Sequence, residues 1–124
     1  MKFASVRVVT RDLDGLVEFY QRLCGIEAIR PADGFAEMRF EGATLAISAE
    51  HLIKRFNVGA ATAAANQSAI LEFEVEDIEA VFERMKASGT NIVMPTTLMP
   101  WGNRSLLLRD PDGNLVNVFS RPKR

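Results

Sequence analysis

Two glutamates on one predicted strand are the side chains of this sequence with the clearest chemical potential. Glu72 and Glu74 stand two residues apart, so the alternation of a strand places both carboxylates on the same side. Two neighbouring carboxylates can divide the roles of general acid and general base. We prefer a solvated or ion-paired strand face, because nothing in the sequence places a second catalytic partner beside them. No residue is therefore assigned a catalytic role.

Cysteine and histidine each occur once. Cys24 is expected in the last turn of a helix, beside Gly25, and no histidine is near it in sequence to activate it. We therefore interpret it as a buried thiol. His51 falls between the predicted strands, where an exposed or loop-packed ring is expected. A lone cysteine cannot form an internal disulfide, which fits a reducing cytoplasm.

The elements that must position these side chains occur twice. Residues 6–14 (VRVVTRDLD) return as residues 71–79 (LEFEVEDIE), and each is an alternating strand that passes through an aspartate into an amphipathic helix. Asp12 corresponds to Asp77, an offset of 65 (77 − 12), whereas Gly42 corresponds to Gly113, an offset of 71 (113 − 42). The second repeat therefore contains 6 additional residues (71 − 65), which we place around 95–101. Such a repeat constrains the fold more than any single motif.

Each repeat has the pattern βαβββ. The first has strands predicted near 4–9, 26–29, 35–40 and 44–48 and a helix from Asp12 to about Leu23. The second has strands near 70–75, 92–94, 104–109 and 115–119 and a helix from Asp77 to just before Gly89. Turn residues separate these strands, most clearly in the hairpin turn at 110–113 (DPDG).

We predict a single α+β domain over residues 1–124, in which two βαβββ repeats form a curved mixed sheet around a cavity. Repeat one covers about 1–48 and repeat two about 70–121. The segment between them, about 49–69, begins with a short helix at 50–56 and is otherwise rich in small residues. A lid over the cavity and a loose linker are both open, and we favour the linker slightly.

Composition excludes several classes of partner. The net charge of −1 gives no electrostatic footprint for nucleic acid or an anionic membrane. No apolar run approaches the length of a membrane span, and a charge at Arg7 interrupts the first strand, so no signal peptide is expected. We therefore expect a cytoplasmic protein without nucleic-acid or membrane partners.

The repeat, together with 101–104 (WGNR) and 109–115 (RDPDGNL), resembles the vicinal oxygen chelate superfamily over essentially the whole chain. That superfamily includes glyoxalase I, extradiol dioxygenases, fosfomycin-resistance enzymes and bleomycin-resistance proteins. The resemblance implies a homodimer, often with elements exchanged between subunits. It specifies the fold far better than the activity, because the scaffold hosts unrelated functions.

The resemblance also implies where a metal would bind. Metal-dependent members draw four ligands from four strands, and matching the motifs places those positions at Ser5, Ala46, Ile70 and Asn117. The offset of 65 relates Ser5 to Ile70, and the offset of 71 relates Ala46 to Asn117. Hydroxyl, methyl, hydrocarbon and amide groups cannot replace imidazole and carboxylate donors. We therefore expect no metal, no cofactor and none of the metal-dependent activities.

Alternation then gives the remaining residues of the cavity face. If Ser5 faces the cavity, Arg7, two residues further along the strand, faces it as well. In the same way, Glu72 shares the face of Ile70, and Phe119 shares the face of Asn117. Arg7 and Glu72 correspond in the repeat, so we predict that they approach each other, as a ligand anchor or as a structural pair. The register is the weak point, since a slip by one residue would turn these charges to solvent.

Trp101 follows Pro100 in the additional residues, so it is expected on a loop at the cavity mouth. The stretch resembles the bleomycin-resistance branch, in which aromatic side chains stack on flat parts of the drug. Closure of the hydrophobic core is an equally weighted alternative. The ligand-binding candidates are thus Trp101, Arg7, Glu72, Asn117, Ser5 and Phe119.

We predict a metal-independent protein that binds a drug-like or partly aromatic small molecule by sequestration, as in antibiotic resistance. One alternative is a metal-independent enzyme, of lyase or isomerase type, that uses acid/base residues in the same cavity. Another is a non-catalytic interaction module whose cavity has collapsed. The sequence does not identify the ligand.

Overall fold

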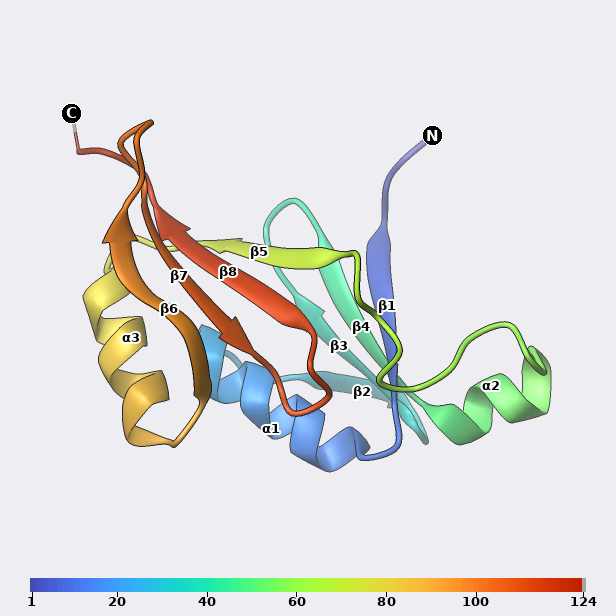
Figure 1. The fold of residues 1–124 in the computed structure, drawn as a ribbon. Coiled ribbons are helices and arrows are strands. Elements are labelled where there is room, and N and C mark those ends of the chain that lie inside the picture. The colour runs from blue at the N-terminus through green and yellow to red at the C-terminus, as the bar shows by residue number, and fades with distance from the viewer. Residues whose placement is uncertain (124) are drawn as a thin grey trace. The chain divides into compact units, whose positions relative to one another are not determined.

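Two aspartates start the two longer helices of the fold (Figure 1). The Asp12 carboxylate accepts a hydrogen bond of 3.0 Å from the Gly15 backbone N–H, at the start of α1 (Leu13–Cys24). The Asp77 carboxylate accepts one of 3.1 Å from the Ala80 N–H, at the start of α3 (Ile78–Ala87). Each cap satisfies a donor that the helix itself leaves free. Both helix starts agree with the prediction from the repeat.

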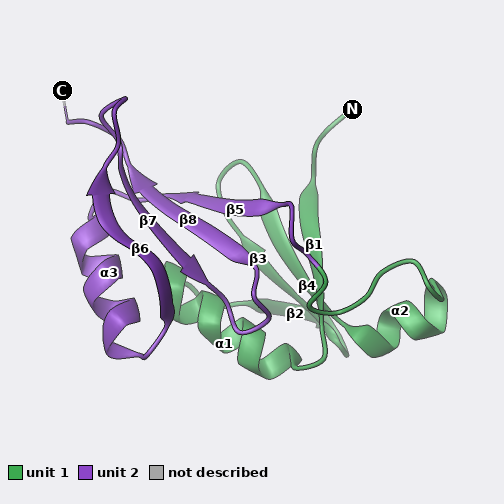
Figure 2. Ribbon diagram, in the orientation of Figure 1, with its two compact units in different colours: residues 1–65 green, residues 66–124 purple. Residues whose placement is uncertain are grey.

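The computed structural model describes residues 1–123, and the chain divides into two compact units (Figure 2). Unit 1 is residues 1–65, and unit 2 begins at Asn66. The division falls inside the segment that the sequence placed between the repeats.

Unit 1 contains a four-stranded mixed sheet with the strand order β1-β4-β3-β2. Its elements are β1 (Ser5–Thr10), α1, β2 (Ile29–Ala32), β3 (Phe35–Arg39), β4 (Thr44–Ala49) and α2 (Glu50–Phe56). β1 pairs with β4 in parallel, and the other pairs are antiparallel. The short helix predicted at 50–56 is confirmed.

Unit 2 repeats this topology with the order β5-β8-β7-β6. Its elements are β5 (Ile70–Glu74), α3, β6 (Asn91–Leu98), β7 (Arg104–Arg109) and β8 (Leu115–Ser120). β5 pairs with β8 in parallel, as β1 does with β4. The predicted α+β fold of two βαβββ repeats is confirmed, as two four-stranded mixed sheets rather than as one sheet.

In each unit a helix covers one face of the sheet. α1 packs on β3 and β4, and α3 packs on β6, β7 and β8. The buried apolar side chains include Leu16, Val17, Tyr20, Met38, Leu45 and Ile47 in unit 1 and Ile78, Val81, Met85, Leu106, Leu108, Val116 and Val118 in unit 2. Because strand side chains alternate, the remaining strand positions lie on the face turned away from that helix, here called the non-helix face.

Two strand boundaries differ from the prediction, and proline is involved in both. The predicted strand at 26–29 is in fact β2, Ile29–Ala32, with Pro31 inside it. The predicted strand at 92–94 extends to Leu98 through Pro95, with register shifts against β7. Both strands lie at sheet edges, where the missing N–H of proline breaks no ladder bond. The additional residues of the second repeat therefore lengthen the β6–β7 hairpin instead of forming a separate loop.

The Glu50 carboxylate holds the segment that follows α2 against unit 1. It accepts a hydrogen bond of 3.1 Å from the Ala63 N–H and lies 3.4 Å from both Arg11 Nε and Lys54 Nζ. The Ala63 hydrogen bond, followed by the charges of Arg11 and Lys54, lowers the pKa of Glu50. The segment is therefore fastened at one point rather than loose.

None of the helices in residues 1–123 is long and apolar enough to span a membrane.

Glu50→Gln keeps the shape of the side chain but removes its charge, and we expect faster hydrogen exchange at the Ala63 amide. In the wild type the stabilisation should be full above the pKa of the unfolded chain and lost as the pH falls through the lower folded-state pKa. Hydrogen exchange followed by NMR against pH measures this. Glu27→Gln, at an exposed glutamate of the same unit, is the control. Identical Ala63 exchange in wild type and Glu50→Gln would show that the contact does not hold the segment.

Candidate functional site

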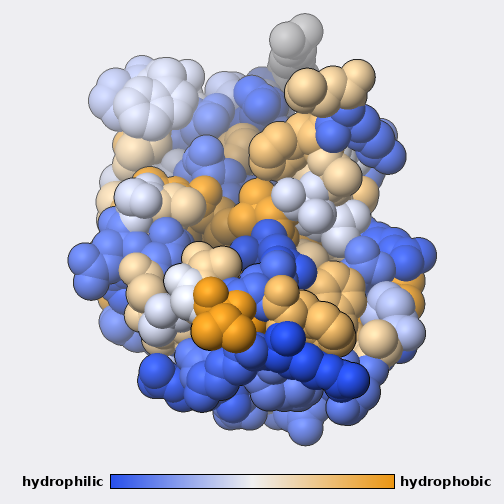
Figure 3. Space-filling view, turned by 90° about the vertical axis from the view of Figure 1, so that its right-hand side faces the viewer, coloured by the Kyte–Doolittle hydropathy of each residue, from blue (hydrophilic) through white to orange (hydrophobic). Residues whose placement is uncertain are grey.

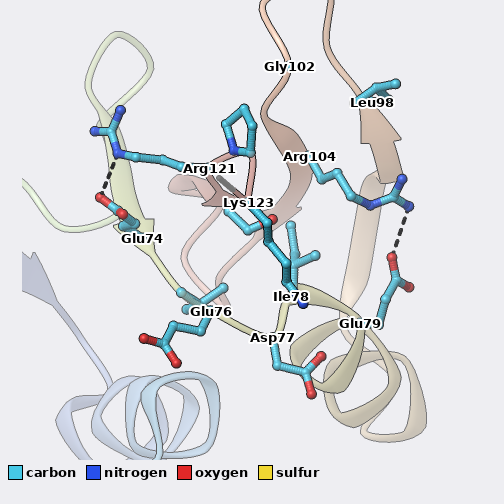
Figure 4. A pocket seen from close by; sticks show the side chains of 13 residues that line it. Glu74, Glu76, Asp77, Ile78, Glu79, Leu98, Gly102, Arg104, Arg121 and Lys123 are labelled. Carbon is cyan, nitrogen blue, oxygen red and sulfur yellow. Dashed lines mark hydrogen bonds and ion pairs between the residues drawn. The ribbon is translucent and has the colours of Figure 1, made fainter.

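A pocket of about 860 Å³ lies in unit 2, at the edge where β5 and β8 both end (Figure 4). Its lining includes residues 74–79, which connect β5 to α3, Leu98, Gly102 and Arg104 of the β6–β7 hairpin, and residues 120–123 after β8. Because β5 and β8 are parallel, their carboxyl ends share one edge. Sites in α/β sheets commonly lie at such an edge, and the volume is within the usual range for small-molecule sites, about 300–1,000 Å³.

Two ion pairs lie on opposite sides of the pocket, with Ile78 and Lys123 between them (Figure 4). Arg121 Nε is 3.1 Å from Glu74 Oε1, and Arg104 Nη2 is 3.0 Å from Glu79 Oε1. Side-chain exposures of 47–65% make these weak surface pairs, each worth roughly 0–1 kcal/mol. Either arginine can therefore exchange its carboxylate for a charged group of a ligand at small cost.

The backbone fixes these charged groups at the end of the sheet. The Val75 N–H donates to the Phe119 carbonyl at 2.9 Å, which extends the β5–β8 pairing to the pocket. The cap at Asp77 then starts α3, and its first turn carries Glu79. A carboxylate in the first turn of a helix is also favoured by the helix dipole. Ile78 is 3% exposed and anchors this turn to the core.

The β6–β7 hairpin forms another wall of the pocket. Its turn is closed by backbone hydrogen bonds from Met99 N–H to the Asn103 carbonyl and from Gly102 N–H to the Met99 carbonyl, at 2.7 and 2.9 Å. Gly102 has a φ of 99°, and a Cβ there would lie 2.9 Å from Pro122 Cγ. Glycine thus allows both the turn and the close approach of the C-terminal residues.

Gly102→Ala should destabilise the protein by roughly 1–3 kcal/mol, because the side chain meets both an unfavourable φ and Pro122. Chemical denaturation measures this. Gly42→Ala is the matched control, since Gly42 has a φ of 91° but nothing within 4 Å of the added Cβ. The excess loss at Gly102 reports the contact with Pro122. Equal losses in the two variants would show that this contact does not constrain the hairpin.

Trp101 lies on this hairpin beside Gly102 and is 68% exposed. This exposure does not fit the alternative in which its indole closes the hydrophobic core. Leu98, on the same hairpin, is 63% exposed and lines the pocket. Figure 3 shows that hydrophobic groups on one face of the molecule form separate patches among hydrophilic ones.

The non-helix face of unit 2 brings together three of the predicted site residues. Glu72 lies opposite Asn117, and Glu74 lies opposite Phe119. Asn117 Nδ2 donates a hydrogen bond of 2.8 Å to Glu72 Oε2, while the Arg121 guanidinium lies 5.5 Å from the centre of the Phe119 ring. Glu74 and Arg121 also line the pocket. The face and the pocket are therefore continuous.

The non-helix face of unit 1 carries the other two predicted residues, Ser5 and Arg7, opposite Thr44 and Ala46 of β4. Sequence reasoning missed two charges on this face. Glu37 lies opposite Ala46 from the other side, and Arg39 is two residues further along β3. The alternation of 35–39 could have identified both. Arg7 and Glu72 belong to different units, and their pairing stays a prediction.

The four positions at which the resemblance would place metal ligands do not fit a divalent ion. Ala46 presents a buried methyl group, Ile70 a hydrocarbon chain and Ser5 a hydroxyl. Asn117 donates its Nδ2 to Glu72, and its Oδ1, which is buried without a hydrogen-bond partner, offers a single neutral amide oxygen. Within residues 1–123, no three His, Cys, Asp or Glu side chains are grouped so that they could hold a metal ion. This donor set lacks the imidazole and carboxylate groups that such ions require.

The single histidine and the single cysteine belong to unit 1, and neither is among the residues that line the pocket of unit 2. His51 is exposed, and its Cε1 and Nε2 lie 2.8 Å from the position that a Cβ on Gly34 would take, so the ring packs on the β2–β3 turn. Cys24 is partly exposed at the end of α1. The prediction of a buried thiol is wrong in this respect, because the helix ends at Gly25 immediately after it.

Comparison with known proteins identifies the family. The model of the Glyoxalase/Bleomycin resistance protein/Dioxygenase superfamily matches residues 2–118, and the chain therefore belongs to this superfamily. No curated protein matches the sequence.

Several solved structures share the fold. A glyoxalase/bleomycin resistance protein/dioxygenase family enzyme from Burkholderia phytofirmans PsJN has a TM-score of 0.83 and 17% identity, over 97% of this chain and 98% of that chain. A glyoxalase/bleomycin resistance protein/dioxygenase from Nocardioides has a TM-score of 0.77 and 24% identity, over 99% and 85%. TioX from Micromonospora sp. ML1 has a TM-score of 0.73 and 22% identity, over 98% and 99%. At these identities the likeness shows the fold alone.

Proposed function

We propose that this chain is a metal-independent binding protein that sequesters a drug-like or partly aromatic small molecule. The observation that carries the proposal is the pocket of about 860 Å³, walled by the hairpin that carries the exposed Trp101. Its two arginines are already paired with Glu79 and Glu74, and its wall includes the apolar Val75, Ile78, Leu98 and Pro122. Such a lining suits a ligand with a flat apolar part and a few polar groups.

Each candidate residue has a role in this proposal. Trp101 stacks on a planar part of the ligand, because an indole offers a large apolar face at little cost in side-chain entropy. Glu72, Asn117 and Phe119 extend the contact over the non-helix face of unit 2. Arg7 and Ser5 of unit 1 are proposed as further polar contacts.

We also propose that the protein acts in the cytoplasm as a homodimer, and that sequestration protects the cell from an antibiotic. The strand orders support the dimer, because β1 and β5 each end a sheet and leave a strand edge that pairing would cover. The absence of fitting metal donors at Ser5, Ala46, Ile70 and Asn117 supports binding without a metal.

A thermal melt of the purified protein against bleomycin-type glycopeptides and other planar natural products tests this function. A specific ligand at a hundredfold excess over its Kd should stabilise the protein by about 2.7 kcal/mol, which is several degrees. The shift should disappear in Trp101→Ala. Phe56→Ala is the matched control, since Phe56 is 65% exposed in unit 1 while Trp101 is 68% exposed. No shift with any compound, or an equal loss in both variants, would contradict the proposal.

Sequestration also predicts that the ligand is recovered unchanged. In Glu72→Gln the amide oxygen of the glutamine can still accept the hydrogen bond from Asn117, but the negative charge is lost. We expect ligand binding to weaken by no more than roughly tenfold, as for the loss of one charged contact. Calorimetry and mass spectrometry of the recovered ligand measure both points. Conversion of the ligand by the wild type, abolished in Glu72→Gln while binding persists, would instead establish a metal-independent enzyme.

A further inference from the structure

We propose that the non-helix face of unit 1 is a binding site for a carboxylate, held by Arg7 and Arg39. The inference deepens the proposed function, on which it rests for the idea that Arg7 meets a ligand. It uses residues of unit 1 alone, so its test is separate from that of the pocket in unit 2.

The register across β1, β4 and β3 places both arginines on this one face. Arg7 lies opposite Ala46, and Ala46 lies opposite Glu37. In the adjacent row, Ser5 lies opposite Thr44, and Thr44 lies opposite Arg39. Neighbouring strands are about 4.8 Å apart, so Arg7 and Arg39 start about 10 Å apart across the sheet and one alternation apart along it. Two arginine side chains can converge over that distance.

Ala46 lies on the middle strand, opposite Arg7 on one side and Glu37 on the other. Its side chain is a single methyl group and the residue is 2% exposed, so neighbouring side chains already cover it. A longer side chain at this position would hold those neighbours apart. The hydroxyl groups of Ser5 and Thr44 stand in the next row and can donate to an oxygen of a bound group.

The charges of this face leave one guanidinium without a carboxylate in unit 1. Arg39 Nη2 lies 2.8 Å from Glu37 Oε1, and the two side chains are 57% and 23% exposed. Arg7 is exposed, and within residues 1–65 it forms no ion pair. Two guanidinium groups therefore face one carboxylate, which orients Arg39 but neutralises only half of the positive charge.

This arrangement selects a carboxylate by geometry as well as by charge. The N–H groups of a guanidinium form a planar fork that matches the two oxygens of a carboxylate. We infer a bidentate contact from Arg7, with further N–H groups of Arg39 and the hydroxyl groups at the edge.

Titration with benzoate tests the proposal, with the neutral benzamide as the isosteric control. In protein labelled with ¹⁵N-arginine, benzoate should shift the Nε–H signals of Arg7 and Arg39 in a saturable manner, and benzamide should not. Arg7→Gln should weaken benzoate binding by roughly tenfold or more, as expected for loss of a charge-assisted bidentate contact. Arg7→Lys keeps the charge but loses the fork, so it should restore only part of the affinity.

Arg30→Gln is the matched control, because Arg30 is an exposed arginine of the same sheet whose guanidinium lies 3.0 Å from Asp14 of α1, on the opposite face. It should leave benzoate binding unchanged. A non-saturating shift, an equal response at Arg30, or full affinity in Arg7→Gln with an unchanged melting temperature would each overturn the proposal. If only the thermal melts against planar natural products show no ligand, the proposed carboxylate site of unit 1 is not contradicted. If only the benzoate titration fails, the proposed function of the pocket in unit 2 is not contradicted.

Discussion

The parallel pairing of the first and last strands of each repeat is the constraint on which the rest of the structure depends. β1 against β4, and β5 against β8, fix which side chains turn toward the helix and which turn away. In unit 2, residues such as Val116 and Val118 are fully buried on the helix side. Each such side chain contributes roughly 1.5–3 kcal/mol, so a slip by one residue would be severely destabilising. The positions of Glu72 and Asn117 are thus set by apolar burial on the other side of the sheet.

The same constraint explains how much of the fold could be predicted. The repeat, the two aspartate caps and the alternation of the central strands are local or periodic signals, and they gave the topology and the shared face of Glu72, Asn117 and Phe119. The inclusion of Pro31 and Pro95 in strands could not be predicted, because the effect of proline depends on whether a strand lies at a sheet edge, which only the tertiary structure decides.

The pocket could not be predicted for a different reason. Its ion pairs join side chains that are far apart in sequence, Glu74 with Arg121 and Glu79 with Arg104, and no local pattern relates them. The pair of Glu37 and Arg39, by contrast, lies within one alternating strand and was open to the reasoning that found Arg7. Each of these ion pairs compensates charge over a short distance, whereas Arg7 has no such partner within unit 1. The net charge of −1 gives little long-range attraction for a ligand, so exchange of partners at these pairs is the more important effect.

The lengthened β6–β7 hairpin has a consequence for how such a protein can evolve. The additional residues extend an edge strand and its turn, whereas the helix caps and the parallel strand pair keep the repeat's plan. Changes in the turn of this hairpin that keep Gly102 therefore alter one wall of the pocket and leave the helix cap and the parallel strand pair unchanged. A duplicated scaffold that varies in only one copy can acquire new ligands while its stability is preserved by the part that does not change.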